Sequence, residues 1–404
     1  MFLSIARRAS GALLACGLLA VLVAADAAEP PVELSSILSL TGNAAFIGKE
    51  EQQSLMAIEK NVNRKGGIRG RQIHFVVQDD QSQPQVGVQL VNALIAKKVP
   101  AIFGPTSSGV CSATYAIVKD NGPVIYCYAP GIHPAPGTYA FSATVGSGDM
   151  AVVIARWLRL KGRKNVALIS STDASGQDFE HGFDAALALP ENASLKLVSR
   201  EHFATNDLSV NAQISRIKTA NPQALIAWTA GTGFGTVMHG LKDVGLDVPI
   251  VGGNGNMIPQ QLAQYGGFLP KELYFPGGRG MSREGTDAGP VRDKQKLYFD
   301  ARAALGEKVS FPSFAAWDST YVMLDAFRDV GFDATAKQIR DSIRGRRGWV
   351  GMNGIYDYRD AEQRGVGPMN CVIDRYDRTR EAFVPASRPG GFINNARGYP
   401  LNRS

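Results

Sequence analysis

The stretch VPAIFGPTSSGVCSATYAIVKDNGPVIYCYAP, residues 99–130, decides the fold. A short apolar strand leads into the turn 104–109, a helix follows, and a second apolar strand ends near Tyr128. The first amides of such a helix lack intrahelical partners and lie at the positive end of its dipole, so the turn can hold a small anion. Because the rest of the sequence offers little clear chemistry, we expect function to depend on what binds against this turn.

Outward from this unit, short apolar runs alternate with amphipathic stretches. The sequence predicts strands over 32–40, 73–77, 99–103, 124–128, 139–144, 166–169, 195–199, 224–228 and 248–251, and near Leu273 a short strand that passes into the Gly-rich stretch 276–280. Almost wholly apolar strands separated by helices indicate parallel sheets covered on both faces, which is an α/β fold. The pattern restarts at the helical stripe of Met150, Val153 and Trp157, so we expect a second lobe of the same architecture. Short strands over 354–358, 369–376 and 382–384 predict a closing meander.

Length and charge narrow the class of protein. The chain has 404 residues, and single cores stop growing at about 250–300 residues, so two domains are expected. The 43 basic and 36 acidic residues give a net charge of +7, but the positive charge is spread out. Its densest cluster, residues 344–347, is better explained as a solvated loop than as a nucleic-acid site. We therefore expect no nucleic-acid partner.

The N-terminus predicts export. Arg7 and Arg8 precede an apolar run over 13–23, and Ala25-Asp26-Ala27 fits the small-x-small rule, so residues 1–27 form a predicted signal peptide. A lipoprotein signal ending at Cys16 is the alternative, which the continuing apolar run disfavours. No later segment approaches the about 18 apolar residues that a membrane span needs. We expect an exported protein without a membrane span.

Enzyme signatures are missing from the sequence. The five histidines are isolated, and there is no H-E-x-x-H, G-x-S-x-G or Walker A motif, so we expect no catalytic site, no metal and no cofactor. Cys111, Cys127 and Cys371 remain after export, and their spacing matches no zinc pattern. An oxidising compartment permits a bridge between Cys111 and Cys127, which the sequence leaves open.

Gly- and Ser-rich turns open several of the expected helices. They are residues 106–109, 146–149, 175–178 and 231–235. In doubly wound sheets such turns lie at the carboxyl ends of the strands, where ligands bind. A serine that caps its own helix explains any single turn. Their accumulation on both expected lobes favours a shared cleft.

A series of motifs carries a family resemblance. These are LTG at 40–42 with Gly48, NRKGGIRG at 63–70, the Asp pair at 79–80, GPTSS at 104–108 and GPV at 122–124. In this order they resemble the periplasmic leucine/isoleucine/valine-binding protein family, over about residues 32–376. The resemblance implies a type I periplasmic-binding-protein fold, with two Rossmann-like lobes joined by three hinge crossings, near 143–146, 275–278 and 350–353. Lobe 1 would comprise 28–144 plus 277–350, lobe 2 would comprise 145–276 plus 351–386, and 387–404 would form a C-terminal tail.

The resemblance also implies roles for individual residues. By position, Ser108 would bind the ligand carboxylate, and Ala129 would offer main-chain contacts. Gly131 stands where amino-acid binders usually have a threonine, and Ile47 and Ser175 stand where they have tyrosines. Ser82 and Ser107 occupy the positions of the family's disulfide.

Asn254 departs from the family at the acidic residue that pairs with the ligand ammonium. A buried ammonium without an acidic partner costs several kcal/mol, so this departure argues against an amino-acid ligand. Small residues at Gly131, Ser175 and Gly231 would leave room for a ring, and Phe46, Ile47, Tyr128 and Trp317 are candidate apolar walls. The full set of expected ligand-binding residues is Phe46, Ile47, Thr106, Ser107, Ser108, Tyr128, Ala129, Gly131, Ser175, Thr229, Ala230, Gly231, Asn254 and Trp317.

We therefore expect a monomeric substrate-binding protein of an ABC importer. Its lobes would close on a small carboxylate, such as an aromatic or other hydrophobic acid, and deliver it to a membrane permease. A branched-chain or other amino-acid binder is the first alternative, and a ligand-sensing receptor domain of the same fold is the second. An exported enzyme is disfavoured, because no nucleophile and base set is visible.

Overall fold

The computed structural model describes residues 29–281, 289–359 and 363–393. The expected signal peptide, residues 1–27 with Cys16, lies outside the described residues. The first sheet has five parallel strands, in the order β2 (Ile73–Asp79), β1 (Val32–Leu38), β3 (Ala101–Phe103), β4 (Val124–Cys127) and β5 (Ala140–Ser142). Strands β3 and β4 are the two strands of the 99–130 unit, so the first expected strand–helix–strand element is confirmed.

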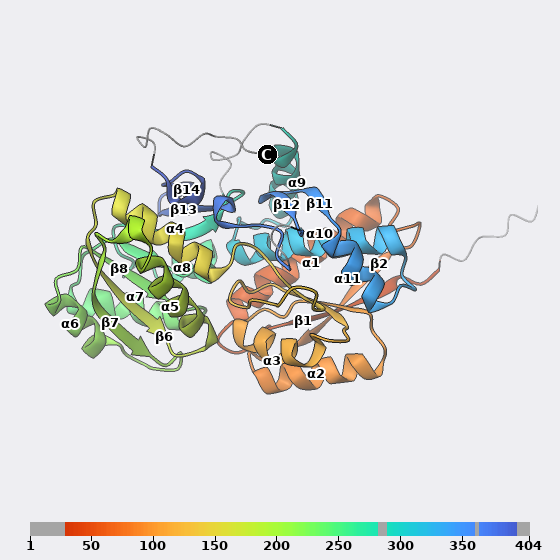
Figure 1. Cartoon of the computed structure of the whole chain (residues 1–404), viewed down its shortest axis with the longest axis horizontal. Coiled ribbons are helices and arrows are strands. Elements are labelled where there is room, and N and C mark those ends of the chain that lie inside the picture. Colours follow the sequence, from red (N-terminus) through yellow and green to blue (C-terminus); the bar gives the residue numbers. More distant parts are fainter. Residues whose placement is uncertain (1–28, 282–288, 360–362, 394–404) are drawn as a thin grey trace, which may run out of the picture. The chain divides into compact units, whose positions relative to one another are not determined.

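Helices cover both faces of this sheet. Figure 1 shows α2 (Pro84–Ala96) and α3 (Ser108–Val118) on one side of β1, and α1 (Ala45–Arg64) on the other. Three helices from much later in the chain complete this lobe: α9 (Pro290–Ala303), α10 (Phe311–Val330) and α11 (Ala336–Arg344). Helix α10 packs along α1, and α11 packs against β4.

The NRKGGIRG motif ends α1 and turns the chain into β2. Gly67 has φ +77°, and a side chain there would lie 1.9 Å from the carbonyl oxygen of Arg71, so only glycine fits. The Asn63 side chain accepts from the amide of Ile73 at 2.9 Å and donates to its carbonyl at 2.8 Å. The motif therefore fixes how the first helix meets the edge strand.

The second sheet has seven strands. Their order is β14 (Ala382–Pro385), β13 (Cys371–Asp377), β10 (Leu273–Gly278), β9 (Ile250–Gly252), β8 (Ala224–Trp228), β6 (Asn165–Ser171) and β7 (Lys196–Phe203). Strands β6 to β10 run parallel, whereas β13 pairs antiparallel with β10 and β14 antiparallel with β13. The helices of this lobe are α4 (Ser147–Leu160), α5 (Ala174–Leu187), α6 (Asn211–Thr219), α7 (Gly233–Val244) and α8 (Pro259–Gln264). The α/β fold of two lobes with largely parallel sheets is thus confirmed.

The chain passes between the lobes after β5, after β10 and before β13. The third passage was expected near 350–353, but there β11 (Arg347–Gly351) and β12 (Gly354–Asp357) form a hairpin. Gln363 follows the hairpin and still bonds the first sheet, since its carbonyl accepts from the amide of Ser142 at 2.9 Å. The passage to the second sheet therefore comes between Gln363 and β13, and the hairpin strand β11 had no sequence prediction.

Arg364 ties this passage to the first one. Its buried guanidinium donates to the carbonyls of Ala143 and Thr144, at 3.2 and 3.1 Å, and to those of Pro130 and Ile132, at 3.2 and 2.6 Å. Burial lowers the pKa of Arg364 to about 10, so it remains charged at neutral pH. The guanidinium thus braces the loop after β4 that reaches the site described below.

Three smaller features complete the fold. Cys111 and Cys127 form a disulfide, which joins α3 to the end of β4. The described part of the expected tail lies on α4, where Arg156 donates to the carbonyl of Gly390 at 2.8 Å and stacks on Phe392. Among the described helices, none has both the length and the apolar composition that crossing a bilayer requires.

Candidate functional site

A cavity of about 390 Å³ lies between the two lobes, and we call it the interlobe pocket. Both sheets supply it from the carboxyl ends of their strands, as expected for open α/β sheets. From the first lobe come the start of α1, the turn before α3, the end of β4 and the start of α10. From the second come the turn before α5 and the residues after β7, β8 and β9.

The turn before α3 presents one capping serine and one uncommitted serine. The Ser107 side chain accepts from the amide of Val110 at 3.3 Å, so Ser107 is the N-cap. Ser108 is the first residue of the helix, and within the described chain its hydroxyl makes no hydrogen bond. The amides of Ser108 and Gly109 also have no intrahelical partner. A free hydroxyl and helix-start amides therefore face the pocket together.

The Asp79–Asp80 pair holds the loop between β1 and α1 against this turn. Asp79 Oδ1 accepts from the amide of Leu40 at 2.9 Å, and its Oδ2 accepts from the Thr41 hydroxyl at 2.7 Å. Burial alone would raise the pKa of Asp79, but these hydrogen bonds and others lower it. Ser82 donates from its hydroxyl to the carbonyl of Thr41 at 2.7 Å. The motif thus positions the loop that leads into the pocket-lining start of α1.

Two further groups from the first lobe line the pocket. The Glu51 carboxyl is 1% exposed, and its Oε2 accepts from the Thr106 hydroxyl at 2.5 Å. Burial raises the pKa of Glu51 well above its ordinary value. The Tyr128 ring forms an apolar wall, and its hydroxyl bonds the Thr320 hydroxyl at 2.8 Å. Burial raises the pKa of Tyr128, so the phenol is neutral.

The second lobe supplies an aromatic wall and short polar side chains. Trp228 ends β8 and stacks on Phe179 with a centroid distance of 3.7 Å, which fixes its ring at the pocket. The Thr229 hydroxyl is buried and has no partner among the described residues. Asn254 accepts from the amide of Gly255 at 2.9 Å. Its amide nitrogen lies 3.3 Å from the sulfur of Met150, so the side chain is held in place.

Asp173 is the N-cap of α5 and the second acid on the pocket wall. Its Oδ1 accepts from the amide of Gly176 at 3.0 Å and from the Ser171 hydroxyl at 2.9 Å. No lysine, arginine or histidine is among the described residues that line the pocket. A ligand here is therefore bound by hydroxyls, amides, two acids and apolar walls.

Most of the expected ligand-binding residues meet in this pocket. They are Ile47, Thr106, Ser107, Ser108, Tyr128, Ala129, Ser175, Thr229, Ala230 and Asn254. Phe46 does not line it and instead packs, half-buried, against the small cluster that contains Ile47 and Ile258. Helical geometry explains this, since Phe46 and Ile47 point to different sides of α1.

The two glycines expected to make room for a ligand ring have other uses. A side chain at Gly231 would lie 2.0 Å from the carbonyl oxygen of Asn43, and the amide of Thr232 donates to that oxygen at 3.3 Å. Gly231 therefore permits direct contact between the lobes. A side chain at Gly131 would lie 2.5 Å from the Ser108 hydroxyl oxygen. Gly131 therefore leaves the Ser108 hydroxyl unobstructed.

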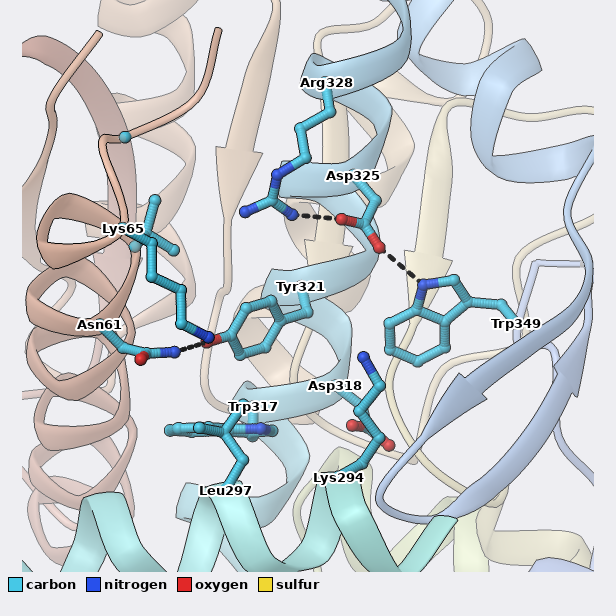
Figure 2. A pocket seen from close by; sticks show the side chains of 12 residues that line it. Asn61, Lys65, Lys294, Leu297, Trp317, Asp318, Tyr321, Asp325, Arg328 and Trp349 are labelled. Atoms are coloured by element: carbon cyan, nitrogen blue, oxygen red, sulfur yellow. Dashed lines mark hydrogen bonds and ion pairs between the residues drawn. The ribbon is translucent and has the colours of Figure 1, made fainter. Parts of the chain in front are cut away.

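Trp317 lies in a different cavity. This lateral cavity, about 200 Å³, lies between α1, α9, α10 and β11, and Figure 2 shows Trp317 on its floor. In Figure 2 Asn61 bonds the hydroxyl of Tyr321 at 2.7 Å, and Asp325 accepts from the indole of Trp349 at 2.8 Å. On α10 it is Phe311, Pro312 and Ala315 that face the interlobe pocket, because Trp317 points to the α9 side of the helix.

The residues that the sequence analysis missed carry recognisable signals. Glu51 stands four residues after Ile47, hence on the same face of α1. Trp228 is the last residue of the buried strand β8. Asp173 caps α5, the helix that follows the buried strand β6. The remaining missed residues are Asn43, Ala44, Ser82, Pro84, Gly109, Pro130, Ala174, Thr205, Gly253, Gly255, Phe311, Pro312 and Ala315.

Among the described residues, no group of three or more His, Cys, Asp or Glu side chains is placed to hold a metal ion. Cys371 is a buried free thiol, and burial raises its pKa well above the ordinary value.

Comparison with known proteins agrees with this architecture. A family model described as periplasmic binding protein matches residues 31–372. The Leu/Ile/Val-binding protein BraC3 of Rhizobium johnstonii is 25% identical over 243 residues, which cover 59% of this chain and 65% of that relative. The match thus spans less than two thirds of the relative's length.

Solved structures share the fold at low identity. The periplasmic binding protein type 1 from Bordetella pertussis Tohama I has a TM-score of 0.76 and 20% identity, covering 88% of this chain and 99% of that one. A fatty acid ABC transporter substrate-binding protein from Thermomonospora curvata has a TM-score of 0.75 and 17% identity, covering 88% and 91%. At these identities the likeness concerns the fold alone.

Proposed function

The chain belongs to the periplasmic binding protein family, and we propose that it is the substrate-binding component of an ABC importer, trapping a small organic carboxylate between its lobes. It would act in the periplasm as a monomer and deliver the ligand to a membrane permease. Closure would follow from tighter binding of the ligand by the closed arrangement. Members of this fold are named both for branched-chain amino acids and for fatty acids, so the choice of ligand rests on the pocket.

One observation carries the proposal: the Ser108 hydroxyl and the first amides of α3 are uncommitted and face the interlobe pocket. Helix-start amides and hydroxyls suit a carboxylate, which they bind without a cationic side chain. The walls opposite are apolar, formed by Ile47, Tyr128 and Trp228. A ligand with a carboxylate at one end and an aromatic or aliphatic body matches this arrangement of a polar helix start and apolar walls.

An amino-acid ligand is the second candidate, and a specific observation favours it. Asn254 cannot pair with an ammonium group as an acid would, but Glu51 and Asp173 both line the pocket. Either carboxyl is a chemically suitable partner for an ammonium group, if it is ionised in the complex. The two candidate ligands therefore differ in the group that they would place beside these acids: an amino acid brings an ammonium group, and a simple carboxylate brings none.

A thermal-shift screen tests the choice. Leucine, isoleucine and valine are compared with 4-methylpentanoate, phenylacetate, benzoate and octanoate. A ligand at 100 times its Kd stabilises the folded state by about 2.7 kcal/mol, which gives a clear rise in Tm. We expect carboxylates to raise Tm and amino acids to leave it unchanged. A rise with leucine or valine alone would overturn the carboxylate proposal and establish the second candidate.

A further inference from the structure

Glu51 occupies an unusual position in the interlobe pocket. Its Oε2 accepts from the Thr106 hydroxyl, and Thr106 in turn accepts from the amide of Ser39 at 3.0 Å. Within the described chain, Oε1 of Glu51 makes no hydrogen bond. Since Glu51 lines the pocket, this second carboxyl oxygen is the one available to a ligand.

Among the described residues, the groups that face Glu51 include no cation. The acid that acts on Glu51 is Asp80, which is linked to it through Ser39 and Thr106, since the Ser39 hydroxyl donates to Asp80 Oδ1 at 2.6 Å. Asp80 Oδ2 is buried and has no partner in the described part of the chain. From the end of β4, Tyr128 contributes only a neutral phenol. The start of α10 contributes Phe311, Pro312 and Ala315, and the acid on the opposite wall is Asp173.

Glu50, the preceding residue, shows what a paired glutamate looks like here. Its Oε2 lies 2.5 Å from Nη2 of Arg302 and accepts from the Ser310 hydroxyl at 2.6 Å. Both members of this pair are buried, and they join α1 to α9. Glu51 has no such partner, so an ionised Glu51 would be a buried and uncompensated charge.

Burial raises the pKa of Glu51 well above its ordinary value against the lowering effect of the Thr106 hydrogen bond, and Asp80 adds a smaller rise, so the neutral form of the carboxyl is favoured. A neutral carboxyl carries one proton and donates one hydrogen bond. Because Thr106 donates to Oε2, the proton resides on Oε1, the oxygen without a partner. In its neutral form Glu51 would therefore present a free O–H donor to the pocket.

We propose that Glu51 is a specificity-determining residue that stays protonated and donates from Oε1 to a carbonyl or carboxylate oxygen of the ligand. The inference rests on the proposed function, because such a donor suits a ligand oxygen and offers nothing to an ammonium. An ammonium ligand would instead require Glu51 to lose its proton. Binding of a carboxylate would therefore leave the proton on Glu51, whereas binding of an ammonium ligand would release it.

Three probes with one carbon skeleton separate these cases: 4-methylpentanoate, 4-methyl-2-oxopentanoate and leucine. Isothermal titration in buffers of different ionisation enthalpy, across a pH series, measures Kd and the protons exchanged. We expect the two acids to bind without proton release, and Kd to rise about tenfold per pH unit above the pKa of Glu51.

Glu51→Gln is the decisive variant, because its amide is neutral and still donates. It should bind the acids within about threefold of the wild type and show no rise of Kd at high pH. Glu51→Leu, which cannot donate, should bind them at least about tenfold more weakly. Glu50→Gln is the matched control, since it should lower stability while leaving the pH profile of binding unchanged.

The outcomes distinguish the inference from the proposed function. Acid binding with a flat pH profile, equal in wild type, Glu51→Gln and Glu51→Leu, would overturn the role of Glu51 and leave the function standing. Leucine binding with proton release, lost in Glu51→Gln, would overturn both. A further measurement needs no ligand: the infrared difference between wild type and Glu51→Gln at neutral pH should show a protonated carboxyl band, and a carboxylate band alone would refute the proposal.

Discussion

Asp318, on α10, should make the stability of this protein fall as the pH rises through neutrality. The Asp318 carboxyl is 4% exposed, and it binds the β11–β12 hairpin, which precedes the third passage between the lobes. Its Oδ1 accepts from the amide of Met352 at 3.0 Å, and its Oδ2 accepts from the amide of Asn353 and the hydroxyl of Tyr356, at 3.0 and 2.9 Å. Burial outweighs these hydrogen bonds and raises the pKa of Asp318 to about 6.

The sign follows from linkage between protonation and folding. The folded-state pKa lies above the ordinary value of 3.8, so the folded state binds the proton more tightly. The resulting stabilisation is fully present below the unfolded pKa and is lost as the pH rises through about 6. The full contribution is about 3 kcal/mol, of which about 1 kcal/mol is lost between about pH 5 and about pH 7.5.

The perturbation is Asp318→Asn, and the assay is urea unfolding at both pH values. In either orientation the asparagine NH2 group would face at least one of the three donors, Met352 N–H, Asn353 N–H or Tyr356 O–H, so we expect a loss of about 1–3 kcal/mol in the free energy of unfolding at either pH. Other titrating groups are shared by both proteins, so the change in the free energy of unfolding between the two pH values should be about 1 kcal/mol smaller in the variant. Equal pH dependence of stability in the wild type and the variant would refute the assignment of this effect to Asp318.

Three further predictions concern the site and its frame. Ser108→Ala should weaken binding of the carboxylate found in the screen by about 1.5–3 kcal/mol, because a hydrogen bond to a charged group is lost, and an unchanged Kd in calorimetry would show that the hydroxyl does not touch the ligand. Glu50→Gln should lower the free energy of unfolding by about 3–5 kcal/mol, since it leaves Arg302 buried without its counter-charge; a denaturant midpoint equal to that of the wild type would contradict this. Replacing Cys111 and Cys127 by serine should cost about 3 kcal/mol through the closed loop of 16 residues, with thermal melts that match the wild type arguing against it.

Much of the fold was predictable because its signals are local. Apolar runs such as 224–228 indicate buried strands wherever they lie, and Gly66–Gly67 ends a helix by backbone conformation alone. The third hinge passage was not predictable in the same way. The strand over 354–358 was expected, but β11 looks like a short connection, and its pairing with β12 depends on α9 and on Asp318 from α10.

The candidate site also combines features that local sequence signals predict with features that depend on tertiary packing. Ser107 and Ser108 are adjacent, chemically alike and both line the pocket, yet the Ser107 hydroxyl caps the helix and the Ser108 hydroxyl does not, and only the direction of each hydroxyl separates them. Trp317 was expected at the ligand because it is a large aromatic residue on a nearby helix. Its place in the lateral cavity depends on how α10 is rotated against α1 and α9, which no local pattern records.

The sequence by itself determined the alternation of strands and helices, the two lobes and the helix-start turn at 104–109, because helix caps, tight turns and apolar periodicity act between neighbouring residues. Only the tertiary structure decided the chemistry of the pocket. Glu50 and Glu51 are identical neighbours in sequence, but among the described residues packing places Arg302 beside the first and no cation beside the second. Charge state depends on what lies within a few ångströms in space, and the partner of Glu50 comes from a helix 252 residues away in the sequence.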